Sequence, residues 1–528
     1  MNCKKITCLA LVLILVAALA AGCTPAATGG DGSGDTPGGG AATVDTIFGL
    51  PRAETFVFGA AEPVRTLNPF MGTGRLTASV VQHITHDVLA WREADGTIVP
   101  RMAESWRLVD ALTWEFTLRD NIYAHDGEKL TAENVKFSFE LAINRPEFAE
   151  YQLPHQTGLT EVVIIDELTF QLKTEQPTNS MEFWLFEAPI IPIGFYADAT
   201  DEQMATQSVG FGPYKVVEYV INDRLVLEAF DNYWQGEPDI KYIVFRTIPE
   251  EGARINELRA GSVDFIHNIS LDVADMLDTD VSRLDAQPGL RKMALTISIR
   301  DGHEALSDRR VRQALNYAVN KESIIENFLG GFTAPLRSYV NPPNNNPALS
   351  PYPYDPDRAR ALLAEAGWAE GLALVLQAPT SRYGLDREIT MQIAADLEAV
   401  GIAVTNEFTE LGVFLDRLDA FELTDLVWIG WAALVNPVIE NLILTGGHTD
   451  NSATWANPEF DALFGQLSTT MDPAELQRVN FQMQEIAWEE APWIWLWHLP
   501  QVSGISNRID WEIRNDGYFD IMNARIVG

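Results

Sequence analysis

Alternating apolar and polar residues predict β-strands along this chain. Thr113–Leu118 and Tyr242–Thr247 alternate with a period of two, which is typical of a strand with one buried face. Three further short apolar runs, Leu372–Leu376, Ala403–Phe408 and Leu426–Ile429, are separated by helical patterns. Strands that alternate with helices favour a parallel sheet, so the second half of the chain is predicted to contain a parallel α/β region.

Helices are predicted where apolar residues recur every three or four positions between start and stop signals. Thr131 is followed three residues later by Asn134, a side-chain amide, in the manner of a capping box. Ser307–Ala318 carries Val311, Leu315 and Ala318 on one stripe. Gly367 is a stop signal for the helix before it. The other predicted helices are Asp357–Ala366, Tyr383–Val400 and Pro473–Glu490.

The first residues form an export signal. Two lysines precede the apolar run Ile6–Ala21, which is shorter than the roughly 20 residues of a membrane span. Small residues then lead directly to Cys23, in a pattern that resembles a bacterial lipoprotein cleavage box, although Ala20 stands where Leu is usual. We therefore predict a signal peptide at 1–22 and lipid attachment at Cys23. Ordinary cleavage and a retained hydrophobic anchor are the alternatives.

A flexible tether is predicted at 23–47, because Gly is frequent there and little can be buried. The only cysteines are Cys3, Cys8 and Cys23, so the body after the tether can hold no disulfide, Cys-ligated zinc or cysteine nucleophile. A lipid, a tether and then a globular body indicate a cell-envelope protein, either lipid-anchored to the outer face of the cytoplasmic membrane or periplasmic.

The charge excludes two classes of partner. The 528 residues include 37 Lys and Arg against 74 Asp and Glu, a formal net charge of −37. Nucleic acid and anionic lipid surfaces both need a basic protein surface, so neither is expected as a partner, and the Cys23 lipid is the only predicted membrane contact. The length predicts more than one lobe, because single cores stop growing at roughly 250–300 residues.

Motifs for catalysis, cofactors and metals are absent or incomplete. Gly72–Gly74 and Gly210–Gly212 begin dinucleotide-like loops but lack the third Gly. No P-loop and no G-x-S-x-G sequence occurs. His83 and His86 have the spacing of metal ligands on a helix, but no third ligand is indicated nearby, which favours packing histidines. We therefore predict no catalytic residue, no cofactor and no metal.

Nine local sequence blocks together carry a family resemblance. They are Arg65–Pro69, Leu112–Arg119, His125–Ser138, Val209–Lys215, Asp231–Trp234, Leu258–Asp264, Asp308–Tyr317, Tyr354–Gly367 and Trp455–Asp461. In order and spacing they closely resemble extracellular solute-binding protein family 5, the oligopeptide-, dipeptide- and nickel-binding lipoproteins of ABC importers. The resemblance extends from about Glu54 to the C-terminus. Phe211 departs from the small residue that is usual at that turn.

The resemblance implies an α/β, two-lobed periplasmic-binding-protein (Venus-flytrap, type II) fold with an extra subdomain in the first lobe. The implied first lobe is discontinuous, and the second lobe follows its middle segment. The expected boundaries are 48–87, 206–292 and 500–528 for the first lobe, 88–205 for its subdomain and 293–499 for the second lobe.

The implied function is capture of a solute between the lobes and delivery to an ABC permease, with ATP hydrolysed by separate ATPase subunits. A peptide-like solute and a monomeric protein are expected. Two alternatives remain open at this point. One is the same transport role for an oligosaccharide or other non-peptide solute, and the other is an exported enzyme on a related scaffold.

The resemblance also implies a set of cleft residues. Dipeptide-binding relatives keep an Arg for the ligand carboxylate where this chain has Arg382, and peptide binders keep an Asp for the ligand ammonium where it has Leu434. Loss of that acid predicts a solute that is neutral or acidic at the Leu434 end, unless Glu407, Glu410 or Glu440 replaces it. The residues predicted to bind the solute are Arg382, Tyr383, Trp428, Trp431, Leu434, Asn436, Trp495 and Trp497.

Three tryptophans add an aromatic feature to this prediction. Trp493, Trp495 and Trp497 alternate along one segment, so all three are expected on one face of a strand. Core packing is one interpretation of that face. The other is that one or two rings line the cleft, where they would stack on sugar rings as readily as on peptide side chains.

Overall fold

The computed structural model describes residues 46–72, 74–148, 152–299, 303–380, 382–431, 435–448, 451 and 454–527. All of them belong to one compact unit, Asp45–Gly528. The predicted signal peptide, Cys23, nearly all of the predicted tether and Leu434 lie outside the described residues.

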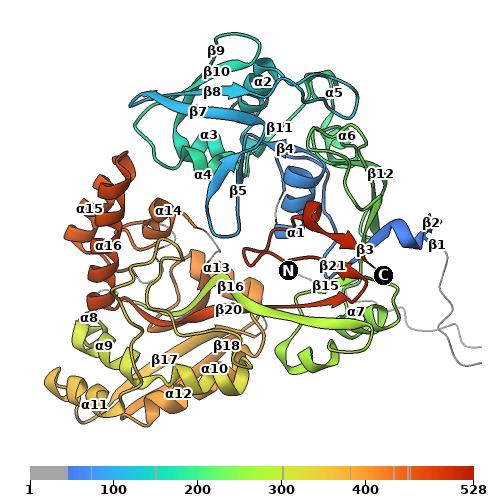
Figure 1. Ribbon diagram of the computed structural model, residues 1–528. Helices are drawn as coiled ribbons and strands as arrows, with labels where there is room; N and C mark the ends of the chain where they lie inside the picture. The colour runs from blue at the N-terminus through green and yellow to red at the C-terminus, as the bar shows by residue number, and fades with distance from the viewer. Residues whose placement is uncertain are drawn as a thin grey trace, which may run out of the picture. The chain divides into compact units, whose positions relative to one another are not determined.

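A ten-stranded mixed sheet runs through the body (Figure 1). Its strands, in spatial order, are β12 (Tyr214–Val220), β13 (Arg224–Ala229), β14 (Tyr242–Thr247), β3 (Thr55–Ala60), β15 (Phe265–His267), β20 (Trp493–Ser506), β16 (Ser282–Ile297), β19 (Leu426–Trp431), β17 (Leu372–Pro379) and β18 (Ile402–Thr409). We call the part with β12, β13, β14, β3 and β15 the first lobe, and the part with β19, β17 and β18 the second lobe.

Two long antiparallel strands, β16 and β20, connect the lobes (Figure 1). Their pairing is regular from Ser282 to Pro288 and resumes at Lys292, with a register shift between these two positions. A shift of this kind breaks the ladder and bends the strands locally. The predicted lobe boundaries at 292/293 and 499/500 fall beside the shift and stay predictions.

The sheet of the first lobe is buried on both faces. All six residues of β3 are buried, and Phe56 and Phe58 belong to one apolar cluster while Val57 belongs to another. Alternate side chains of a strand point to opposite faces, so a strand between two cores must be apolar throughout. Helix α7 (Glu251–Arg259) adds Ile255 and Leu258 to the second cluster.

The second lobe confirms the predicted parallel α/β region. β17 pairs in parallel with β18 and with β19. The predicted helix Pro473–Glu490 is α16, with the predicted bounds. The remaining helices of this lobe are α8 (Glu304–Ser307), α9 (Arg309–Ala318), α10 (Lys321–Phe328), α11 (Pro356–Glu365), α12 (Asp386–Glu398), α13 (Leu411–Asp419), α14 (Pro437–Leu442) and α15 (Pro458–Thr469).

The chain between β3 and β12 forms a separate four-stranded antiparallel sheet. Its order is β7 (Ala103–Asp110), β8 (Thr113–Leu118), β10 (Thr169–Thr174) and β9 (Leu159–Ile164). Helix α2 (Ala132–Ile143) packs on it, and the predicted capping box of Thr131 and Asn134 is present. Other helices here are α3 (Gln152–Thr157), α4 (Met181–Leu185), α5 (Ile193–Tyr196) and α6 (Asp201–Thr206).

Short elements complete the body. The strands are β1 (Thr46–Ile47), β2 (Leu50–Pro51), β4 (Asp87–Val88), β5 (Ala90–Arg92), β6 (Ile98–Pro100), β11 (Pro189–Ile190), β21 (Ile509–Asp510) and β22 (Arg525–Ile526). Helix α1 (Arg75–Ala78) continues into a π-helix at Ser79–Ile84, and 3-10 turns lie at Arg52–Glu54, Pro146–Phe148, Leu271–Met276 and Ile521–Asn523. No helix within the described ranges is both long enough and apolar enough to cross a membrane.

The two histidines with metal-like spacing are packing residues. His83 and His86 are buried, and their Nε2 atoms lie 2.8 Å from the Phe186 carbonyl oxygen and the Tyr196 hydroxyl, respectively. The described residues contain no group of three or more His, Cys, Asp or Glu that could hold a metal ion.

The prediction that three tryptophans share one strand face is wrong for Trp497. Trp493 and Trp495 lie in one apolar cluster, whereas Trp497 lies in the cluster on the other side, with Ile494 and Leu496. A second register shift explains the difference. Two residues, 496 and 497, oppose the single residue Met293 between the paired positions Lys292–His498 and Ala294–Trp495. The extra residue of such a bulge reverses the alternation after it.

Candidate functional site

A cavity of about 600 Å³ lies where the two connecting strands pass between the lobes. Residues from four regions of the structure line it. They are Glu62, Pro63, Gly74–Thr77 and His267–Ser270 from the first lobe, Gly289–Arg291 and Leu499–Ser503 from the connecting strands, Arg382–Gly384 from the second lobe, and Ile513–Gly517 with Phe519 near the C-terminus. The volume is that of a small-molecule site, for which roughly 300–1,000 Å³ is usual.

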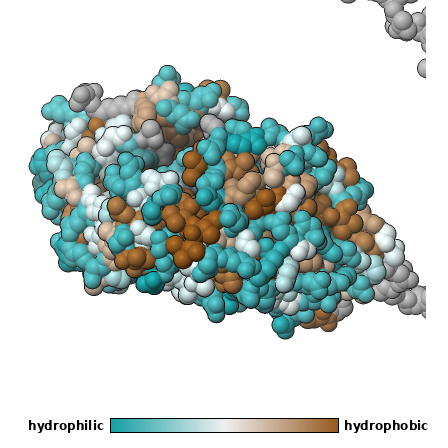
Figure 2. All heavy atoms as spheres, turned by 90° about the horizontal axis from the view of Figure 1, so that it is seen from above, coloured by the Kyte–Doolittle hydropathy of each residue, from teal (hydrophilic) through white to brown (hydrophobic). Residues whose placement is uncertain are grey.

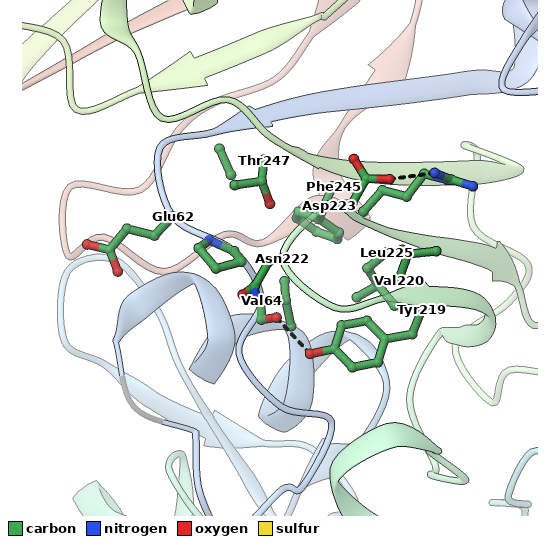
Figure 3. Close-up of a pocket in the computed structure, with 12 residues that line it drawn as sticks. Glu62, Val64, Tyr219, Val220, Asn222, Asp223, Leu225, Phe245 and Thr247 are labelled. Atoms are coloured by element: carbon green, nitrogen blue, oxygen red, sulfur yellow. Dashed lines mark hydrogen bonds and ion pairs between the residues drawn. The ribbon is translucent and has the colours of Figure 1, made fainter. Parts of the chain in front are cut away.

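A neighbouring hollow does not compete with this cavity. It is lined by residues such as Val64, Tyr219 and Thr247 and holds only about 10 Å³ (Figure 3). That is room for about one water. The Tyr219 hydroxyl donates to the Val64 carbonyl oxygen at 2.8 Å across its floor, so we assign the hollow no function.

The cavity is cationic although the chain is strongly acidic. Its charged lining consists of Arg75, Arg291, Arg382 and Arg514 with the acids Glu62 and Asp516. Both acids already have arginine partners, since Asp516 pairs with Arg514 at 2.6 Å and Glu62 with Arg65 at 2.8 Å. The face of the molecule seen from above carries both hydrophilic residues and hydrophobic patches (Figure 2). The cavity therefore favours anions over cations.

The buried carboxylate of Asp386 shapes the turn that carries Arg382 and Tyr383. Asp386 is 3% exposed. It accepts hydrogen bonds from the backbone nitrogens of Arg382 at 2.6 Å and Tyr383 at 3.0 Å, and from Trp428 Nε1 at 2.7 Å. Satisfying a buried carboxylate in this way is a requirement of folding. It also orients the turn toward the cavity. The residues Arg382, Tyr383 and Trp428, which the sequence predicted, are thus brought together by Asp386, which it did not.

Gly430 on β19 joins this turn to Arg291. The backbone nitrogen of Gly430 donates to the Tyr383 hydroxyl at 2.9 Å, and its carbonyl oxygen accepts from Arg291 Nη1 at 3.0 Å. The Tyr383 ring and the Arg291 side chain cross directly over this glycine. A Cβ at position 430 would lie 2.7 Å from Met293 Sδ, 3.0 Å from Tyr383 Cε1 and 3.1 Å from Arg291 Cδ.

Gly430→Ala is therefore expected to displace Tyr383 and Arg291 and to weaken solute binding at least tenfold. Overpacking of this kind also costs about 1–3 kcal/mol of stability. Calorimetric titration of the folded variant measures the effect. Gly465→Ala is the matched control, because Gly465 is helical and has no atom within 4 Å of an added Cβ. Unchanged affinity in Gly430→Ala would remove these two side chains from the site.

The other predicted site residues do not line the cavity. Trp428 and Trp495 are 1% exposed and Trp497 is 0% exposed, and all three lie in the apolar clusters. Trp431 stacks on Trp493 with ring centroids 5.4 Å apart. Asn436 caps α14 by accepting from the backbone nitrogens of Val438 and Ile439. That these residues contact a solute stays a prediction.

The three acids considered as replacements for the missing carboxylate are engaged elsewhere. Glu407 pairs with Arg417 at 3.0 Å, and Glu410 caps α13. Glu440 accepts from Lys292 Nζ at 2.7 Å and from the Asn341 backbone nitrogen at 2.8 Å. None of the three lines the cavity, and the two acids among the described residues that do, Glu62 and Asp516, are paired with Arg65 and Arg514.

Comparisons with known proteins agree with this architecture. The sequence profile of the bacterial extracellular solute-binding proteins, family 5 Middle, matches residues 97–453. The glutathione-binding protein GsiB of Pectobacterium atrosepticum is 25% identical over 84% of this chain and 88% of its own length. The dipeptide-binding protein of Escherichia coli is 27% identical over 85% of this chain and 90% of its own length.

The comparison of structures identifies the fold. The structure of HbpA2 from Haemophilus parasuis superimposes with a TM-score of 0.80 at 22% identity, over 89% of this chain and 99% of that one. The expected two-lobed type II periplasmic-binding-protein fold is thereby confirmed.

Proposed function

Because this chain belongs to family 5 of the bacterial extracellular solute-binding proteins, whose members serve ABC importers, we propose that it captures a peptide-like solute in the cavity between its lobes. It then delivers the solute to an ABC permease. The observation that carries the proposal is the cavity itself, which has the volume of a small molecule and is lined by both lobes and both connecting strands. Relatives named for dipeptide and glutathione binding support a peptide-like solute.

The connecting strands supply the motion that capture requires. Their pairing is interrupted between Pro288 and Lys292, and Gly289–Arg291 within this interval line the cavity. A few residues at the end of a paired segment are enough to absorb a hinge rotation. Solute bound at this point contacts both lobes only when they are closed, so binding favours the closed form.

The geometry favours this proposal over the two alternatives. Carbohydrate binding rested on one or two of the rings of Trp493, Trp495 and Trp497 as stacking platforms, and all three are buried away from the cavity. The aromatic rings that do line it are those of His267, Tyr383 and Phe519. The enzyme alternative has no support from the family, which is a class of non-enzymatic binding proteins.

The proposal is tested by solution scattering and thermal unfolding with a panel of free and N-acetylated dipeptides. A bound peptide is expected to decrease the radius of gyration. It also stabilises the protein by about 2.7 kcal/mol at a hundredfold excess over Kd. Peptides that bind without any change in the scattering curve would contradict closure. Failure of every peptide, with another small solute binding, would contradict the peptide-like substrate class.

A contact outside the cavity is expected to stabilise the closed form. Asn179 lies between β10 of the four-stranded sheet and α4. Its Nδ2 donates to the carbonyl oxygens of Leu467 at 2.7 Å and Thr470 at 2.9 Å. These carbonyls lie at the C-terminal end of α15 in the second lobe, where backbone acceptors have no partner within the helix.

Asn179→Ala is expected to weaken solute binding about three- to tenfold without touching the cavity, because two hydrogen bonds to the second lobe are lost. The unliganded variant should also have a larger radius of gyration than the wild type. Asn327→Ala is the control, since Asn327 is bonded only within its own helix among the described residues. Equal affinities and equal radii in wild type and Asn179→Ala would show that this contact does not stabilise closure.

The lipid anchor remains part of the proposal. Cys23→Ser is expected to move the protein from the membrane fraction to the soluble fraction, because the thioether-linked lipid is the only proposed membrane contact. Fractionation followed by immunoblotting measures the change. A protein that stays with the membrane after this substitution would have another anchor.

A further inference from the structure

We propose that the cavity selects solutes whose buried end carries two neighbouring carboxylates, held by Arg291 and Arg382 with Arg75 beside them. This inference rests on the proposed solute-binding function and specifies its substrate class. An acidic C-terminal residue, with its main-chain and side-chain carboxylates, has the required chemistry.

Three segments that are distant in sequence bring the guanidinium groups to one cavity. Arg75 lies on α1 of the first lobe, Arg291 on the connecting strand β16, and Arg382 on the turn after β17 of the second lobe. Each is oriented by a described contact. Arg291 donates to the Gly430 carbonyl oxygen at 3.0 Å, Arg382 lies over the Tyr383 ring at 5.0 Å, and Arg75 lies over the Tyr518 ring at 4.3 Å.

The balance of charges sets the number of anionic groups. Asp516 pairs with Arg514 at 2.6 Å, and Glu187 lies 3.9 Å from Arg75. Both acids also lie 3.8 Å from Arg92, which does not line the cavity. Arg291 and Arg382 have no ion pair with any described residue. The lining therefore holds two arginines without an ion-pair partner, and a solute with two carboxylates would supply one to each.

Electrostatic repulsion among Arg75, Arg291 and Arg382 opposes closure of the lobes, and a bound anion relieves it. Burial, together with the positive charges of Arg382 and Arg75, lowers the pKa of Arg291. Gly430 already joins Arg291 to the turn that carries Arg382. Closing the second lobe therefore brings both groups toward Arg75 of the first lobe, so closure without a solute costs free energy. A carboxylate between two guanidinium groups removes this cost and can form bidentate hydrogen bonds with either one.

The test is calorimetry with N-acetyl-Ala-Glu and N-acetyl-Ala-Gln, which are almost isosteric and differ by one carboxylate. The wild type is expected to bind the Glu peptide at least tenfold more tightly. In Arg291→Gln and Arg382→Gln the preference should fall to within about twofold. Arg417→Gln is the control, because Arg417 forms its ion pair with Glu407 outside the cavity, and it should keep the full preference. Equal affinities in the wild type, or a preference that survives both cavity variants, would overturn the inference.

A second measurement uses citrate, a small anion whose shape differs from that of these peptides. Citrate is expected to raise the melting temperature of the wild type above that in sodium chloride of equal ionic strength, and to do so less in Arg291→Gln. If neither peptide binds, this citrate effect supports the paired-anion site and its absence overturns it. If both peptides bind equally and both compact the protein, the transport role stands and the dicarboxylate selectivity alone is wrong.

Discussion

Lys292→Met is expected to lower the free energy of unfolding by about 3–5 kcal/mol at pH 8, because it leaves a buried carboxylate without its cation. Lys292 Nζ lies 2.7 Å from Glu440 Oε1, and the two side chains are 1% and 0% exposed. The other carboxylate oxygen of Glu440, Oε2, has no hydrogen bond within the described residues. Removal of the ammonium therefore exposes the full desolvation cost of the charge. Urea unfolding followed by tryptophan fluorescence measures the loss.

The pH dependence of this loss identifies its cause. Burial raises the pKa of Glu440 to about 7 even though Lys292 and the Asn341 backbone nitrogen oppose the shift. A carboxyl whose folded pKa is raised contributes stability at low pH and loses it as the pH rises through that value. In Lys292→Met the pKa should rise further, so the difference between variant and wild type should shrink below pH 7.

Two controls separate the buried pair from an ordinary ion pair. The double variant Lys292→Met/Glu440→Gln should recover to within about 1 kcal/mol of the wild type, since no unpaired charge remains. Lys173→Met removes a pair with Glu161 at 2.9 Å whose side chains are 41% and 58% exposed, and exposed pairs contribute about 0–1 kcal/mol. A single variant as stable as Lys173→Met at pH 8 would show that Glu440 is not held as a buried anion.

Acid is expected to destabilise the protein well before most carboxylates titrate. Burial lowers the pKa of His83 and His86 to about 3 and that of His125, His267 and His498 to about 4. Unfolded histidine has a pKa near 6.5, so the unfolded state binds more protons below that pH. The stability that these neutral rings provide is complete above pH 6.5 and is lost as the pH falls toward 4.

The expected size of this effect is about 3 kcal/mol for one histidine whose pKa falls from 6.5 to about 4. Glu440 has the opposite effect on the pH dependence of stability and offsets about one proton of the difference, because its pKa in the folded state is raised. Urea unfolding at half-unit steps from pH 7 to 5 measures the slope. His498→Gln keeps a donor for Asn341 Oδ1, which lies 2.8 Å from His498 Nε2, and should reduce the slope by about one proton. Stability that is constant from pH 7 to 5 would contradict the burial of neutral histidines.

The fold followed from the sequence wherever the signals were local. The capping pair Thr131 and Asn134, the strand Tyr242–Thr247 and the helix Pro473–Glu490 all appear where they were predicted. The sequence did not predict the face on which Trp497 lies. The bulge depends on how β20 pairs with β16, and not on the sequence of β20 alone. Periodicity along one segment contains no information about the register of its partner.

The site was predicted only in part, for the same reason. Arg382 and Tyr383 came from a family resemblance, and both line the cavity. Arg75 and Arg291 were missed because they are separated by more than 200 residues and meet only through the sheet. Gly430 carried a usable signal. A glycine inside an apolar strand often marks the close approach of another group, and here that group is the crossing of Tyr383 and Arg291.

Capture of a small solute in this cavity predicts that mass spectrometry will detect a small molecule when the purified protein is denatured. Wild-type protein purified natively from its own cells is expected to release about one equivalent of a small anionic solute. Gly430→Ala should release much less, because its cavity is obstructed by displaced side chains. No small molecule above background from the wild type, or equal amounts from both proteins, would contradict solute capture at this site.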